Sequence, residues 1–368
     1  MLQRLYVDNY RSLINFEFRP GSLCLLLGDN GSGKTTILDV VEMLRDFISG
    51  QSAATVFSHD SLTRWQLIRN QTFEADFMID GKIYTYSLVI EHVQHHGLSR
   101  VQQELLNLDG RPLYSFKDGE AQLYRDDHSQ GPRIPLDWSR SGIGFLHTGP
   151  TNCNIRKFRE HVAGIVVIGL IPCIMSSESY SEISVLDRRG QKFVSWYRAM
   201  ALENPAGVSK LGAILRDIMP GFSALPLRET GSMRVLKAQF DSPESTQKPR
   251  FIEYDFKELS DGQRAIIVLY SLLYMNRGNS FIFWLDEPDN YVSLREIQPW
   301  LSELEECCAE VDQNPQAILV SHHPEMINYI GANRIILLER DGGGPTRVKP
   351  FLAVPGLSGG ETVARGWE

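Results

Sequence analysis

Cysteine is scarce in this chain, which has five cysteines in 368 residues and no pair with C-x-x-C spacing. An odd number of thiols without that spacing argues against a disulfide framework and a zinc site, and it fits the reducing cytoplasm. Long apolar runs are missing too, because no stretch reaches the roughly 18 uninterrupted apolar residues of a membrane span. Val162–Met175 is too short and is interrupted by Gly164, Gly169 and Pro172, so we expect buried core there and no membrane association.

An excess of positive charge is also missing. The formal net charge is −8 and the pI is near 5.7. This balance argues against a surface that coats nucleic acid, although a local basic patch stays compatible with it. The first residues hold no apolar segment of a secretion signal, so we expect a cytoplasmic protein. Sustained a/d heptads are lacking, which argues against a long coiled-coil arm.

A glycine-rich run follows the apolar stretch Leu23–Leu27 and has the pattern G-x-x-x-x-G-K-[ST]. Between a strand and a helix, this pattern predicts a loop whose backbone N–H groups bind phosphates. Lys34 would reach the β- and γ-phosphates and Thr35 would bind Mg²⁺, whereas a chance glycine turn is the disfavoured alternative. The expected nucleotide-binding residues are Gly28, Asp29, Asn30, Gly31, Ser32, Gly33, Lys34, Thr35 and Thr36.

A second apolar run, Phe281–Leu285, ends in Asp286 and Glu287 and is followed by Pro288. It is typical of a buried parallel strand, and ligands bind at the carboxyl ends of such strands. Asp286 would orient Mg²⁺ and its waters, and Glu287 would polarise the attacking water as a general base or an orienting acceptor. A strand that simply ends in a polar turn is the alternative, which the phosphate loop makes the weaker one.

Two further segments follow the phosphate loop along the chain, one before the acidic strand and one after it. In Leu259–Arg264, Ser260 is a good N-cap for the apolar helix that follows, which is also its purely structural interpretation. In Ile318–Glu325 an apolar strand ends in His322 and His323. A histidine pair at a strand end is by itself most often a solvated turn. The order phosphate loop, capped helix, acidic strand and histidine favours a functional role instead.

Together these residues resemble the ABC-type ATPase superfamily, and within it the compact AAA-family ATPases related to RecF and OLD-type ATPases. Leu5–Leu13 is similar to that group's opening strands, and Asp286–Asn290 to its acidic strand end. The resemblance implies an α/β ABC-type ATPase head with a mixed β-sheet core carrying the phosphate loop, an antiparallel β subdomain and an inserted helical subdomain. It implies ATP and Mg²⁺ as cofactors and ATP hydrolysis as the reaction.

The resemblance also assigns roles to the two further segments. Leu259–Arg264 resembles the ABC signature, with Asp261 in place of the usual glycine. Ser260, Gly262 and Gln263 would then bind the γ-phosphate held by a second copy, so two heads sandwich two ATP molecules in a homodimer or higher oligomer. His322 resembles the histidine switch and would help position the water together with Glu287 and Lys34, and His323 is the adjacent alternative.

Two features of the family are harder to place in this sequence. For the contact with adenine there are two candidates, the side chains of Tyr10 and Arg11. A second segment, Leu357–Gly360, also resembles a signature, but we expect it to be a flexible terminus. Three glutamines remain open as the Q-loop residue: Gln66, Gln71 and Gln103.

We expect three parts along the chain. Residues 1–150 form the N-terminal part of the head with the phosphate loop and the antiparallel subdomain, in which Asp-Gly pairs at 80–81, 109–110 and 118–119 predict hairpins. Within this part, residues 127–150 are predicted to be a loop. Residues 151–221 form the inserted helical subdomain, with helices over 193–203 and 208–219. Residues 222–368 form the C-terminal part with the signature, the acidic strand and the histidine.

The leading functional hypothesis is an ATP-dependent switch that regulates a separate effector. The stretch after the histidine strand shows no acidic pattern of a TOPRIM nuclease, so the effector, a nuclease or toxin in anti-phage defence, is expected to be another protein. The alternatives are a DNA-repair ATPase, which DNA would stimulate, and, less favoured, a transporter subunit. One basic group in the inserted region is interpreted as a solvated helix face: Arg156, Lys157, Arg159, Arg188, Arg189 and Lys192.

Overall fold

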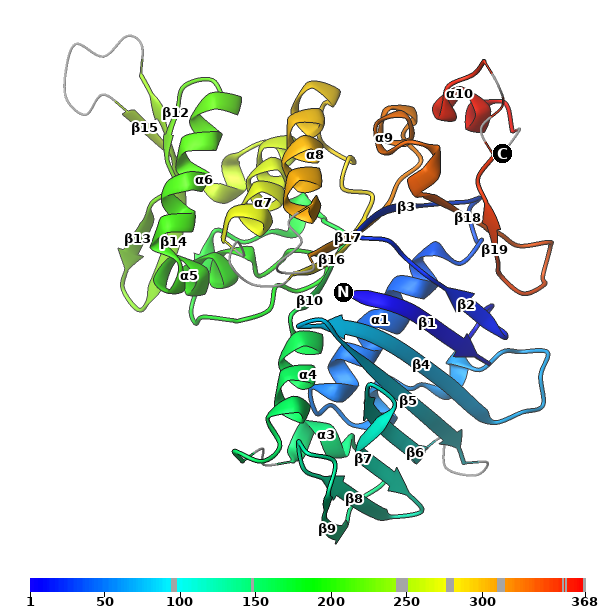
Figure 1. Ribbon diagram of the computed structural model, residues 1–368. Helices are drawn as coiled ribbons and strands as arrows, with labels where there is room; N and C mark the ends of the chain where they lie inside the picture. The colour runs from blue at the N-terminus through cyan, green and yellow to red at the C-terminus, as the bar shows by residue number, and fades with distance from the viewer. Residues whose placement is uncertain are drawn as a thin grey trace.

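The protein is described by a computed structural model in which three β-sheets are joined by helices (Figure 1). The predicted mixed α/β class is confirmed. The structure describes residues 1–93, 98–146, 149–242, 251–275, 281–309, 315–352, 354 and 356–366.

The central sheet carries the phosphate loop. Its order is β10-β16-β17-β3-β18-β19, and all neighbours are parallel except β19, which is antiparallel to β18. All five side chains of β3 and of β17 are buried, as expected for strands covered on both faces. The strands are β10 (Ile165–Ile168), β16 (Ile282–Asp286), β17 (Gln316–Val320), β3 (Leu23–Leu27), β18 (Ile335–Glu339) and β19 (Arg347–Pro350).

Register brings three predicted segments to one edge of this sheet. Val320 pairs with both Asp286 and Leu26, so β3, β16 and β17 end at nearly the same level. The phosphate loop, the acidic pair and the histidines follow directly after these ends. They therefore lie side by side although they are far apart in the chain.

An eight-stranded antiparallel sheet forms the second layer, in the order β2-β1-β4-β5-β6-β7-β8-β9. The predicted Asp-Gly hairpins are confirmed: Asp80 and Gly81 have φ of 51° and 72°, and the pairs at 109–110 and 118–119 are alike. Positive φ at both turn positions matches the twist of paired strands. The strands are β1 (Leu2–Asp8), β2 (Phe16–Phe18), β4 (Asn70–Ile79), β5 (Lys82–His92), β6 (Ser99–Leu108), β7 (Arg111–Lys117), β8 (Glu120–Tyr124) and β9 (Gln130–Pro135).

Helix α1 (Lys34–Ile48) lies between these two sheets (Figure 1). Its buried face belongs to one hydrophobic cluster that includes Phe73 of the antiparallel sheet and Trp284 of the central sheet. Because the phosphate loop leads straight into α1, this packing fixes the direction of the helix N-terminus. A short helix, α2 (Ala53–Val56), and the 3₁₀ turn η1 (His59–Ser61) connect α1 to β4.

Two predictions of irregular structure are wrong. Residues 127–150 contain β9 and a short helix, α3 (Gly142–Phe145), because β9 is an edge strand and an edge strand tolerates Pro132 and Pro135. Residues 359–364 form α10 (Gly359–Ala364), which packs on α9 (Pro324–Ile330) and is not a flexible tail. Ser358 and Glu361 make a capping box, the signal that the sequence carried for this helix.

The region after residue 150 mixes helices with strands. The helix predicted over 193–203 is α5 (Phe193–Glu203), and the one predicted over 208–219 is α6 (Pro205–Ile218), where Pro205 occupies the first turn. The buried segment predicted over 162–175 contains β10, which joins the central sheet beside β16. The remaining elements are α4 (Cys153–Ala163), η2 (Pro172–Ile174), β11 (Glu178–Ser179), β12 (Phe222–Ala224), β13 (Leu227–Thr230), β14 (Met233–Asp241), β15 (Phe251–Asp255) and η3 (Phe256–Glu258).

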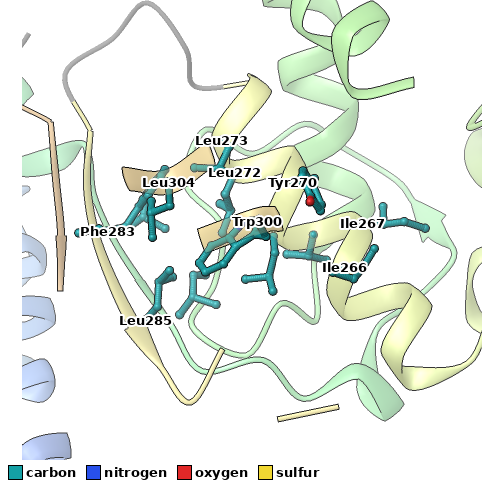
Figure 2. Packing of buried hydrophobic residues seen from close by; sticks show 14 of the residues in the cluster. Ile266, Ile267, Tyr270, Leu272, Leu273, Phe283, Leu285, Trp300 and Leu304 are labelled. Carbon is teal, nitrogen blue, oxygen red and sulfur yellow. The ribbon is translucent and has the colours of Figure 1, made fainter. Parts of the chain in front are cut away.

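Two helices cover the other face of the central sheet next to β16. Figure 2 shows Trp300 of α8 (Leu294–Ala309) between Leu285 of the strand and Ile266 of α7 (Asp261–Met275). Trp300 is fully buried, and burial of an aromatic side chain of this size stabilises such a layer by about 3 kcal/mol or more. The signature helix is thus anchored to the acidic strand. Among the helices that the structure describes, none has the length and apolar character of a membrane span.

Candidate functional site

The phosphate loop needs glycine at defined positions. Gly28, Gly31 and Gly33 have φ of +146°, +83° and +110°, which side chains rarely adopt. A Cβ at Gly28 would lie 2.2 Å from the Leu338 carbonyl oxygen, and one at Gly33 would lie 2.6 Å from Thr346 Oγ1. The loop therefore wraps closely against β18 and the segment before β19, and only glycine fits these two contacts.

Polar groups of the loop converge on its interior. Lys34 Nζ donates to the carbonyl oxygens of Gly28 at 2.5 Å and Asp29 at 2.9 Å. Burial lowers the pKa of Lys34, while Asp286, Asp29 and Glu287 oppose that shift. Ser32 Oγ is buried and has no hydrogen-bond partner within the part of the chain that the structure describes. A cation and an unsatisfied hydroxyl in one loop are the groups that an anionic ligand would satisfy.

The acidic pair follows β16. Burial raises the pKa of Asp286, while the nearby Arg188 guanidinium lowers it. Glu287 has a left-handed backbone with φ of 49°, which its N–H bond to the Val320 carbonyl helps to hold. The Asn290 amide donates to Glu287 Oε2 at 2.5 Å. Strained backbone of this kind is concentrated at functional sites, and Glu287 lines the same cavity as the phosphate loop.

The two histidines have different surroundings. His323 Nδ1 accepts a hydrogen bond from the Glu325 N–H at 3.2 Å and caps α9, so this side chain is used structurally. His322 lines the same cavity as the phosphate loop. Partial burial and Lys34 lower the pKa of His322, although Glu287 and Asp29 act in the opposite direction. The imidazole that faces the site is therefore His322, mostly neutral near pH 7.

A cavity of about 480 Å³ joins these parts. Its wall includes nine of the residues predicted to act on the phosphates, the metal or the water: Asn30, Gly31, Gly33, Lys34, Thr35, Thr36, Asp286, Glu287 and His322. Gly28, Asp29 and Ser32 belong to the same loop but do not line the cavity. The volume and the mostly polar lining suit a nucleotide, because a cleft of several hundred cubic ångströms is usual for such ligands.

Comparisons with known proteins agree with this geometry. A family model described as "AAA domain, putative AbiEii toxin, Type IV TA system" matches residues 23–133. An Smc head bound to the C-winged helix domain of ScpA is 15% identical, covers 95% of this chain and 96% of its own, and gives a TM-score of 0.56. The Smc head with a coiled coil and joint from Pyrococcus yayanosii is 12% identical, covers 99% of both chains and gives 0.52.

The chain has the fold of an Smc head domain. A RecF recombination mediator structure is also similar at 10% identity, covering 95% of this chain and 98% of its own, but its TM-score of 0.45 is too low to support an argument. A search of curated protein sequences finds no significant match.

The predicted signature residues lie outside the cavity wall. Ser260 is exposed and shares a reciprocal cap with Gln263: the Gln263 N–H donates to Ser260 Oγ at 3.2 Å, and the Ser260 N–H donates to Gln263 Oε1 at 3.0 Å. A Cβ at Gly262 would lie 2.6 Å from the Tyr291 carbonyl oxygen, so the segment after the acidic strand packs on this turn. The first turn of α7 thus contributes no residue to the wall of the cavity in its own protomer.

Sequence reasoning missed part of the cavity wall. Arg64 and Trp65, between η1 and β4, line the cavity, and the Trp65 side chain is 49% exposed. Arg340 also lines it and donates to the Gly31 carbonyl oxygen at 3.3 Å. Arg11 lies on the wall as predicted for one of two candidates, whereas Tyr10 is buried against Phe73. A tryptophan among the polar residues Thr63, Arg64 and Gln66 was the signal that the sequence offered for Trp65.

The Q-loop candidates need correction, because none of the three glutamines lines this cavity. Gln71 is buried and bonds to the Asn9 carbonyl and to His92. Arg188 instead faces the acidic pair, with a guanidinium nitrogen 3.7 Å from Asp286 Oδ2. The interpretation of Arg188 as part of a solvated helix face is wrong, since it precedes α5 and is held by carboxylates of α1.

Proposed function

We propose that this protein is an ATPase, which binds ATP with Mg²⁺ and hydrolyses it. The observation that carries the proposal is the convergence of Lys34, Asp286, Glu287 and His322 on one cavity beside the N-terminus of α1. The phosphates would lie in the loop, where backbone N–H groups, the helix dipole and Lys34 favour negative charge.

The residues present fit a magnesium ion. Thr35 and Asp286 line one cavity and supply a hydroxyl and a carboxylate, the hard oxygen ligands that Mg²⁺ uses beside phosphates and water. The metal would neutralise charge that develops on the phosphates. Glu287, held by Asn290, would accept the proton of the attacking water or orient that water. Neutral His322 would hold a second hydrogen bond near the terminal phosphate.

The arrangement also supports a composite site made by two copies. Ser260 caps α7 at an exposed position, and it does not line the cavity of its own protomer. In a head-to-tail dimer, Ser260, Gly262 and Gln263 of one copy would cover the γ-phosphate that the other copy binds. Binding of ATP would then close the dimer and hydrolysis would open it.

The cellular role is a separate part of the proposal. The description of the matched family names a putative toxin and a type IV toxin–antitoxin system. The role proposed for this protein is regulation of a separate effector, such as a nuclease or toxin, in defence against phage. Cells that carry the gene with its neighbours should lose phage protection when Lys34→Ala replaces the wild type. Equal protection by wild type and by Lys34→Ala would show that defence does not need the ATP site.

A complementation experiment tests the composite site. Lys34→Ala should abolish ATP turnover by loss of phosphate binding, and Ser260→Arg should abolish it by blocking the partner's site. An equimolar mixture should recover about one quarter of wild-type turnover, because half of the dimers are mixed and each of these has one intact site. Each variant alone at the same total concentration is the control. A mixture as inactive as its components, with wild type active, would overturn the composite site.

A further inference from the structure

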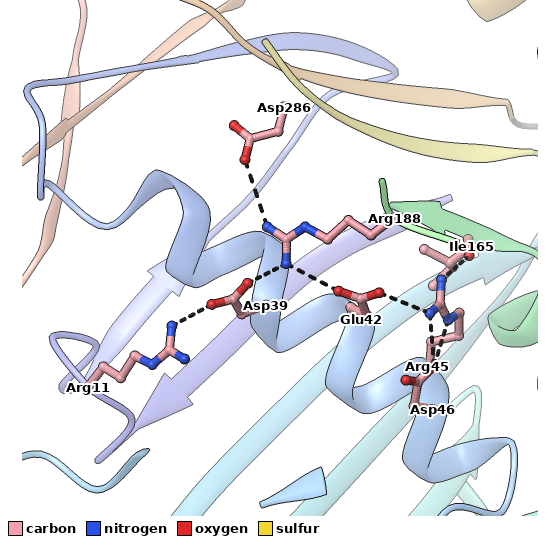
Figure 3. Close-up of polar contacts among 8 residues, drawn as sticks. All are labelled: Arg11, Asp39, Glu42, Arg45, Asp46, Ile165, Arg188 and Asp286. Atoms are coloured by element: carbon pink, nitrogen blue, oxygen red, sulfur yellow. Dashed lines mark hydrogen bonds and ion pairs between the residues drawn. The ribbon is translucent and has the colours of Figure 1, made fainter. Parts of the chain in front are cut away.

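Arg188 connects three carboxylates around the acidic strand. Its guanidinium lies 2.5 Å from Asp39 Oδ1, 3.2 Å from Glu42 Oε2 and 3.7 Å from Asp286 Oδ2 (Figure 3). Asp39 and Glu42 are one turn apart on α1, and Asp39 also pairs with Arg11 of the cavity wall. One planar fork thus bridges the helix of the phosphate loop and the proposed metal ligand, which a lysine ammonium would not span.

The backbone around Arg188 is connected to the signature helix. The Gly169 N–H donates to the Arg188 carbonyl at 2.8 Å, and the Ile171 N–H donates to the Arg189 carbonyl at 3.1 Å. One residue further on, the Pro172 carbonyl accepts from the Arg264 guanidinium at 2.6 Å. Arg264 belongs to the first turns of α7 and is itself paired with Asp261. Packed contacts therefore run from Asp286 to the turn that presents Ser260.

We propose that Arg188 is a positioning residue that transmits cation binding at Asp286 to the first turn of α7. A cation on Asp286 and the guanidinium repel each other, so binding shifts Arg188 toward Asp39 and Glu42. The backbone bonds then carry this shift to residues 169–172 and on to Arg264. The inference rests on the proposed nucleotide function. It adds a route by which metal binding in one protomer's cavity changes the signature turn that this protomer offers to the partner's cavity.

The first measurement separates the effect of the Arg188 charge from the effect of its contacts with three carboxylates. Arg188→Gln removes a positive charge near Asp286 and should raise the affinity for Mg²⁺ in the presence of ADP about tenfold. Arg188→Lys keeps the charge and should bind Mg²⁺ with nearly wild-type affinity. Arg189→Gln is the matched control, because Arg189 is exposed, is next in sequence and forms no ion pair in the described part of the chain. Mg²⁺ titration of a fluorescent ADP analogue gives these affinities.

The second measurement follows the transmitted signal by hydrogen–deuterium exchange of residues 259–264. Mg²⁺·ADP is the ligand, since it lacks the phosphate that a second copy would cover. Wild type and Arg189→Gln should change exchange there with Mg²⁺·ADP but not with ADP and EDTA. Arg188→Gln and Arg188→Lys should both lose the magnesium-dependent change, and Arg188→Lys keeps the test informative if the glutamine variant is unstable.

The outcomes distinguish this inference from the proposed function. If wild type binds Mg²⁺·ADP, Lys34→Ala abolishes that binding, and both Arg188 variants keep the exchange response, the positioning role is overturned while the nucleotide site stands. The same holds if Arg189→Gln changes the metal affinity as much as Arg188→Gln. If wild type does not bind the nucleotide, both proposals fail together.

Discussion

Replacing Gly33 by alanine tests how the phosphate loop is held. The φ of +110° would cost an L-residue about 1–2 kcal/mol. The new Cβ would also lie 2.6 Å from Thr346 Oγ1. This buried hydroxyl donates to the Ser32 carbonyl at 2.8 Å and contacts Ser12 Oγ at 2.9 Å. Displacing this hydroxyl would leave those groups without hydrogen-bond partners, which lowers the free energy of unfolding by about 1–3 kcal/mol.

The expected total for Gly33→Ala is therefore about 2–5 kcal/mol, a large part of the stability of a typical domain. Gly31→Ala is the matched control: its φ is +83°, but nothing lies within 4 Å of the new Cβ. This variant should lose only about 1–2 kcal/mol. Urea unfolding followed by circular dichroism gives the free energies of unfolding. A change in ATP affinity shows distortion that is confined to the phosphate loop.

A double-mutant cycle isolates the contact itself. Thr346→Ala removes the atoms that the Cβ of Gly33→Ala would meet, so the double variant should lose less than the sum of the single losses. Equal effects of the two glycine variants, or strict additivity with Thr346→Ala, would refute the steric argument. The strain would then lie in the backbone alone.

Three further predictions concern turnover, pH and the base of the nucleotide. Glu287→Gln should slow phosphate release by about 100-fold or more while ATP binding persists, and unchanged turnover would contradict the assigned role of the carboxylate. Burial lowers the pKa of His92 to about 4. The unfolded chain, with a pKa near 6.5, then binds more protons between these values, so stability falls as the pH drops through this window. The loss from pH 7.5 to pH 5 should be about 2 kcal/mol larger than in His92→Gln by urea unfolding, and identical pH dependence of the two proteins would exclude this origin. Trp65→Ala should weaken ATP binding about tenfold by loss of stacking but leave tripolyphosphate binding unchanged in competition assays. An equal loss for both ligands would place Trp65 away from the base.

The sequence determined the parts of this protein whose chemistry is local. The phosphate loop follows from glycines that permit positive φ, the buried strands from unbroken apolar runs, and the hairpins from Asp-Gly pairs. Ser358–Glu361 was such a local signal as well, since a capping box starts α10. These features depend on neighbours within a few residues, so a pattern in the chain is enough to predict them.

Tertiary structure decided which distant side chains share the site. The parallel register placed His322 on the cavity wall, while a hydrogen bond to the next helix engaged His323. Arg188 gained its position only because α1 and β16 pack beside the segment before α5. Trp65 reached the cavity through a loop that no periodic pattern describes. Long-range packing sets these distances, and no spacing along the chain encodes them.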